Sequence, residues 1–156
     1  MGGGAVSRAG LVRAAPSPGL VLGVTLTGVA VSAVHYWDNY VNYDSFPQAV
    51  SGPSPSRSFI AVSWFVFTAL AALAVWNHKR GAHAPAALCL AVYSLSGLVG
   101  LGHYTAAGAT EMVWWRQAHV VADIVLGAAV LFLAFAVWRS RGRRPTEPPD
   151  AHRGPA

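Results

Sequence analysis

The chain has 156 residues, of which 54% are hydrophobic and only 11% are charged. An ordinary soluble domain has about 25% charged residues, so this composition excludes a typical water-soluble domain and indicates a membrane protein. The formal net charge is +5. The basic residues lie at the ends of apolar segments rather than on one aromatic-interleaved face, so we expect no nucleic-acid partner.

Residues 1–18 are rich in Gly, Ser and Pro, which predicts a mobile N-terminal segment. Four apolar segments follow, at residues 19–37, 59–76, 84–103 and 113–138. Each is close to or longer than the roughly 20 residues that a helix needs to cross a bilayer. Residues 139–156 lack apolar periodicity and predict a disordered basic tail. The predicted fold class is therefore all-α, a polytopic membrane protein with a bundle of four transmembrane helices.

The basic residues also predict how the chain crosses the bilayer. They lie before the first segment, in the second connection and after the fourth segment, as Arg8, Arg13, Lys79, Arg80, Arg139, Arg141, Arg143 and Arg144. The other two connections have only Arg57 and Arg116. The positive-inside rule then predicts that both termini are cytoplasmic and that the first and third connections face outward. Heavy use of Arg, Ala, Gly and Val favours a bacterium of high GC content, and thus a multi-pass protein of its plasma (inner) membrane.

The first apolar segment also fits a signal peptide, because Arg8 and Arg13 precede it and it ends in the small residues Ala30 to Ala33. Cleavage there would leave three spans. His35 and Asp38 would remain on the outer side in either case.

Ionisable residues gather at the outward ends of three segments. His35, His103 and His119 are accompanied by Asp38, Asp44, Glu111 and Asp123. Such residues are costly at membrane depth, so a one-sided cluster predicts a functional site. Helical spacing puts His35, Asp38 and Asn39 on one face, and places Asp123 one turn after His119. The second segment has only Ser63 and Thr68 as polar groups in mid-span, and we expect it to serve packing.

This residue set predicts a site for a divalent transition metal. Imidazoles and carboxylates from facing helices suit Zn, Fe, Mn or Cu. The expected ligands are His35, Asp38, His103, His119 and Asp123. Asn39, Asp44 and Glu111 are expected to support the ligands or to lie solvated in the loops, where the two acidic residues would pair with Arg57 or Arg116. Metal handling and metal-assisted chemistry on a membrane-soluble substrate both fit, with Asp123 as a possible general base.

Two alternatives stay open, as does the question of whether the protein is an enzyme. Two of the three histidines would ligate haem in an electron-transfer protein. Alternatively, the cluster is a structural or proton-sensing network in a non-catalytic subunit that binds a membrane partner or a second copy of itself. Cys89 is the only cysteine, so an intramolecular disulfide is excluded. The sequence contains no phosphate-binding GxxxxGK[ST] motif and no GxSxG nucleophile motif.

Overall fold

The computed structural model describes residues 15–47 and 55–141, and every regular element in these ranges is helical. The four long helices are α1 (Pro18–Val41), α2 (Arg57–Lys79), α3 (His83–Leu98) and α4 (Trp114–Ser140). Three short 3-10 segments lie between them, η1 (Tyr43–Ser45), η2 (Val99–Thr105) and η3 (Ala109–Glu111). The predicted all-α class is confirmed.

Four helical stretches are long and apolar enough to cross a membrane, α1, α2, α4 and α3 with its continuation to Thr105. This indicates a multi-pass membrane protein. The helices begin and end close to the predicted limits, with two differences. The helix α1 continues to Val41 rather than ending at residue 37, so Asp38 and Asn39 are helical. The third stretch ends as an α-helix at Leu98 and continues as η2.

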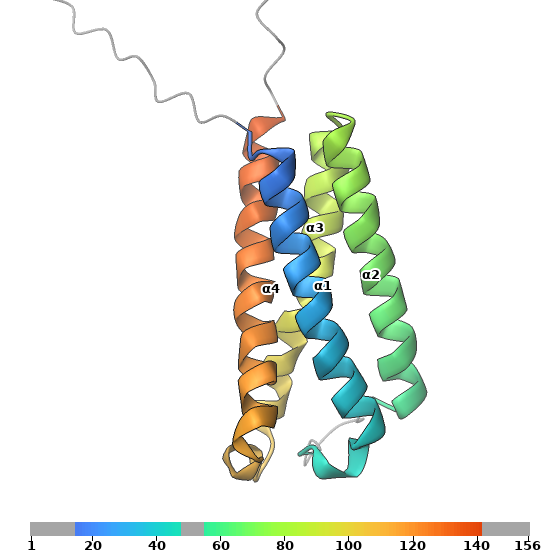
Figure 1. Ribbon diagram of the computed structural model, residues 1–156, viewed down its shortest axis with the longest axis vertical. Helices are drawn as coiled ribbons and strands as arrows, with labels where there is room; N and C mark the ends of the chain where they lie inside the picture. Colours follow the sequence, from blue (N-terminus) through green and yellow to red (C-terminus); the bar gives the residue numbers. More distant parts are fainter. Residues whose placement is uncertain (1–14, 48–54, 142–156) are drawn as a thin grey trace, which may run out of the picture.

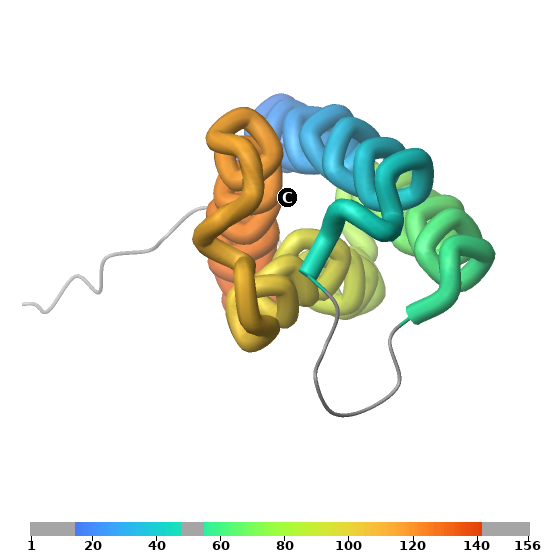
Figure 2. Tube along the Cα trace, turned by 90° about the horizontal axis from the view of Figure 1, so that it is seen from below, coloured from blue at the N-terminus to red at the C-terminus, as the bar shows by residue number. Residues whose placement is uncertain are grey.

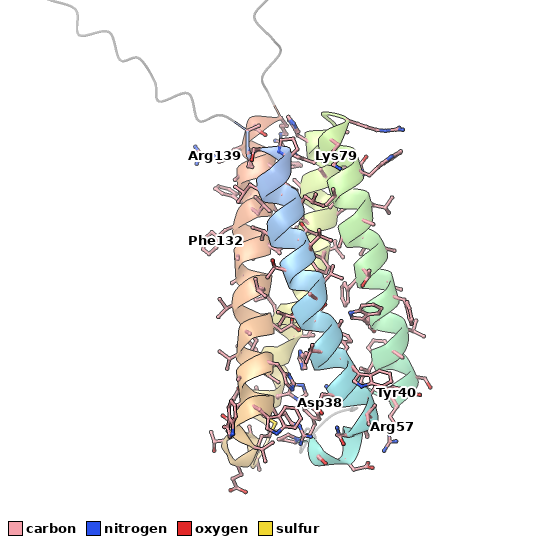
Figure 3. All side chains as sticks on the ribbon, in the orientation of Figure 1. Asp38, Tyr40, Arg57, Lys79, Phe132 and Arg139 are labelled. Atoms are coloured by element: carbon pink, nitrogen blue, oxygen red, sulfur yellow. The ribbon has the colours of Figure 1, made fainter. Side chains whose placement is uncertain are left out.

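The helices form a ring in which α1 packs against α2 and α4, and α3 packs against the same two helices (Figures 1 and 2). The start of α1, the end of α4 and the turn between α2 and α3 lie at one end of the bundle, which we call the basic end. Lys79 and Arg139 mark it in Figure 3, whereas Asp38 and Arg57 lie at the opposite end, which we call the histidine end. The predicted N-terminal segment and basic tail fall largely on residues outside the described ranges.

Local chemistry explains where two of the helices begin. The hydroxyl of Ser17 accepts a hydrogen bond from the backbone N–H of Leu20 at 3.2 Å, and Ser56 caps α2 in the same way through Phe59 at 3.2 Å. Each serine satisfies one backbone donor that the first helical turn leaves open. The turn between α2 and α3 contains Gly81 with a φ of 74°, a conformation that favours glycine.

Two glycines bring α3 and α4 close together beside the ionisable residues. A Cβ atom on Gly97 would overlap the backbone oxygen of Asp123, and one on Gly127 would lie 2.8 Å from the backbone oxygen of Ser94. Small residues of this kind let helix backbones approach closely in a membrane. The position of Asp123 therefore depends on the absence of a side chain at residue 97.

We expect Gly97→Ala to destabilise the protein by about 1–3 kcal/mol, the usual cost of overpacking a close contact. Gly23→Ala is the matched control, because a Cβ atom there meets nothing within 4 Å. Thermal unfolding of both variants in detergent would measure the difference. Equal midpoints for the two variants would contradict a close α3–α4 contact at Gly97.

Candidate functional site

A buried histidine and aspartate connect α1 to α4 at the histidine end. His35 Nδ1 lies 2.7 Å from Asp123 Oδ2, and each residue is only 2% exposed. An ionised carboxylate can only accept hydrogen bonds, so Nδ1 is the nitrogen that donates. Asp123 therefore fixes both the orientation of the His35 ring and its tautomer.

The other nitrogen of His35 is directed at a second histidine. His35 Nε2 lies 3.4 Å from His103 Nε2, and the two ring centroids are 5.6 Å apart. His103 Nε2 is also 3.2 Å from the side-chain nitrogen of Asn39. These contacts bring together α1 and η2, which continues α3 at this end.

Asp38 is the centre of an adjacent ionic network. Arg116 Nε donates to Asp38 Oδ2 at 2.8 Å, and the carboxylate also accepts hydrogen bonds from His119 Nε2 at 3.1 Å and from the side chain of Asn42 at 2.7 Å. Asp38 is 6% exposed and Arg116 is 8% exposed. A charge this far from water is tolerated when it is paired and hydrogen-bonded.

Arg116 also fixes the first connection against the bundle. Its NH1 donates to the backbone oxygen of Ser45 at 3.4 Å, and its guanidinium carbon lies 4.8 Å from the centre of the Phe46 ring. Phe46 is 2% exposed, and its ring centroid is 5.1 Å from that of His103. Phe46, which directly follows η1, therefore packs onto the histidines.

A cavity of about 440 Å³ lies beside these histidines, between α1, α2 and η2. It is lined by His35, Tyr36, Asn39, Tyr43, Pro47, Pro55, Phe59, Ile60, Ser63, Phe67, Val99, Gly100, Gly102, His103 and Thr105. Toward this end α2 stays beside α1 but separates from the continuation of α3 (Figures 1 and 2), and η2 packs mainly against α3, α4 and η3. Phe59 on α2 and Val99 on η2 are exposed, so the cavity lies between two elements that have little contact with each other.

The five predicted metal ligands all lie at the histidine end and come from α1, η2 and α4. They form two pairings, His35 with Asp123 and His119 with Asp38, while His103 contacts His35. Within residues 15–47 and 55–141, no three histidine, cysteine or acidic side chains are grouped so that they could hold a metal ion. The predicted ligands thus pair with one another and do not converge on a single point.

The supporting residues have different surroundings. Asn39 contacts His103, as described above. Asp44 forms an exposed ion pair with Arg57 at 2.6 Å, one of the two partners expected for it. Glu111 is exposed on η3.

Three features of the site were not predicted from the sequence. Arg116 was assigned to a loop as a partner for Asp44 or Glu111, but it lies on α4 and binds Asp38. Its spacing of three residues from His119 was a signal that the two share a helix face. Phe46 was not identified as a packing residue, and α2 lines the cavity with four side chains in addition to packing.

No protein family model, curated protein or solved structure matches the chain. The function therefore has to be inferred from the geometry of the site.

The two ion pairs at the histidine end allow a matched comparison. We expect Arg116→Ala to cost about 3–5 kcal/mol in unfolding free energy, because it leaves the buried Asp38 carboxylate without its charge partner. Arg57→Ala removes a pair with Asp44 in which both side chains are largely exposed, and it should cost less than about 1 kcal/mol. Unfolding of both variants in detergent at one ionic strength would measure the costs. Similar losses would mean that the Asp38 pair is not buried in the folded protein.

Proposed function

We propose that this protein binds a small lipid-soluble molecule in the cavity between α1, α2 and η2, with the polar group of that molecule against His35, His103 and Asn39. The observation that supports this most directly is the cavity itself, whose volume of about 440 Å³ lies within the range of about 300–1,000 Å³ that is usual for ligand pockets.

The lining has the chemical character of such a pocket. Most of its wall is apolar, with Phe59, Ile60 and Phe67 on α2 and Val99 on η2. Ligand pockets typically combine walls of this kind with a few convergent polar groups that fix the orientation of the ligand. Here His35, His103 and Asn39 supply a group of polar side chains that contact one another. This arrangement suits a molecule with one polar end and an apolar body.

Each ionisable residue has a distinct role in this proposal. His35 and His103 contact the ligand, because both line the cavity. Asp123 does not line it and instead orients His35. His35, rather than Asp123 as predicted, is then the group placed to exchange a proton with a bound molecule. Asp38 and Arg116 hold the first connection over the site.

We also propose that the cavity faces outward in a bacterial plasma membrane, with both termini in the cytoplasm. Lys79, Arg80 and Arg139 lie at the basic end, where positive charge favours the cytoplasmic side. At the histidine end, Arg57 and Arg116 are each paired with an aspartate. The charge pattern of the described residues therefore supports the orientation that the sequence predicts.

Photolabelling tests the proposal. A 1-dodecanol carrying a diazirine on its chain should label the α2 wall at Phe59 and Phe67 when added to the protein in nanodiscs, as mapped by peptide mass spectrometry. Ser63→Trp should abolish this labelling, since residue 63 lines the cavity and the indole would fill it.

Val62→Trp is the matched control. It places the same side chain one residue away at a position that is 61% exposed and outside the lining, so labelling should persist. The opposite result would be labelling that is spread evenly over the exposed faces of all four helices and that Ser63→Trp does not change. It would show that the cavity is not a binding site.

One observation favours a transition metal as a second candidate. Two imidazole nitrogens that share a tetrahedral ion with metal–nitrogen bonds of about 2.0–2.1 Å are separated by about 3.3 Å. The separation of His35 Nε2 and His103 Nε2 is 3.4 Å. A metal-bound histidine commonly donates its other ring N–H to a carboxylate. Asp123 provides such a carboxylate for His35.

If a metal binds there, the purified protein should contain about one equivalent of Zn, Fe, Mn or Cu by elemental analysis, and His103→Ala should lose it. His83→Ala at the basic end is the control. Oxidised and reduced optical spectra of the same sample would test the haem alternative. A metal-free, colourless protein that still labels at α2 would reject both cofactors and leave the ligand proposal standing.

A further inference from the structure

We infer that the polar group of the ligand is an uncharged hydroxyl that donates its hydrogen to the His35–His103 pair, so that the substrate class is a lipid-soluble alcohol or phenol. This inference rests on the proposed ligand-binding function. It follows from which atoms donate and accept on the polar side of the cavity, and from where the charged groups lie.

His35 donates its Nδ1 hydrogen to Asp123 at 2.7 Å. An imidazole that carries one hydrogen has one donor and one acceptor nitrogen. With that hydrogen on Nδ1, His35 accepts at Nε2, on the cavity side.

His103 does not supply a hydrogen to this acceptor. The side-chain nitrogen of Asn39 lies 3.2 Å from His103 Nε2 and can only donate. The single lone pair of His103 Nε2 is therefore engaged by Asn39, and this nitrogen carries no hydrogen for His35 Nε2, 3.4 Å away. A bound group that supplies a hydrogen would give His35 Nε2 its donor.

Candidate polar groups differ in whether they can supply this hydrogen. A hydroxyl supplies one hydrogen and retains acceptor capacity, whereas an ether, ketone or ester oxygen can only accept. An acceptor-only group would place its lone pairs against that of His35 Nε2 and leave it without a donor. The geometry therefore selects a donor.

The lining offers no partner for a charged group on the ligand. None of the residues that line the cavity in the described part of the chain is a lysine or arginine, so a carboxylate or phosphate has no cation to bind. The two buried carboxylates lie outside the lining. Asp38 is paired with Arg116 and Asp123 is bound to His35, so a cationic group has no carboxylate to contact either. A neutral donor is the group that remains.

Competition against the diazirine photoprobe measures this preference in the intact protein in nanodiscs. The competitors are 1-dodecanol and its methyl ether, which share the same chain and differ in the hydroxyl hydrogen. We expect the alcohol to reduce labelling of Phe59 and Phe67 at a concentration about tenfold lower than the ether, the effect of one net hydrogen bond.

Three variants test where the hydroxyl hydrogen is received. His35→Phe should bring the ratio of the effective ether and alcohol concentrations close to one, and His103→Phe provides an independent second variant. His83→Phe, at the basic end, should leave the ratio unchanged.

The outcomes separate this inference from the proposal on which it rests. Equal competition by the alcohol and the ether, or stronger competition by the ether, in the wild-type protein would overturn the hydroxyl assignment while the cavity stays a ligand site. A different result would overturn the ligand-binding function itself. In that case neither compound would compete with the photoprobe, and Ser63→Trp would leave the labelling unchanged. A tenfold ratio that persists in both His35→Phe and His103→Phe would also overturn the inference, because the hydrogen would then be received elsewhere.

Discussion

Charge at membrane depth has to be paired or hydrogen-bonded within the protein, because the hydrocarbon offers no alternative partner. The histidine end is organised by this constraint. Asp38 receives hydrogen bonds from Arg116, His119 and Asn42, and Asp123 receives one from His35. Each carboxylate is thereby tied to a different helix or connection. The same bonds that neutralise the acids hold α1, α4 and the first connection together.

This pairing also decides which groups remain available for chemistry. Once the carboxylates are engaged with their partners, the nitrogen-bearing side chains that line the cavity are His35, His103 and Asn39. The site therefore presents imidazole and amide groups to an apolar space instead of a cluster of anionic ligands. For this reason we propose an uncharged amphipathic ligand over a site built from five metal ligands, although two imidazole nitrogens lie close enough to share an ion.

The cavity exists because the helices pack unequally around the ring. The glycines at positions 97 and 127 let α3 and α4 come into close backbone contact. On the opposite side, α2 diverges from η2 and the wall is made by large side chains such as Phe59 and Phe67. The tight side positions Asp123 and His35, and the open side is where we propose that a ligand enters.

The residue pattern was enough to predict the all-α class, the approximate limits of the four spans and the gathering of His35, His103 and His119 at one end. These depend on apolar length and on position along each helix, which are local properties of the chain. The partners of the ionisable residues could be seen only in the folded protein. Arg116 binds Asp38 rather than Asp44, and α2 forms a cavity wall. Such outcomes depend on helix rotation and on the distance between helices, which are set by contacts between residues far apart in the chain, such as Gly97 with Asp123.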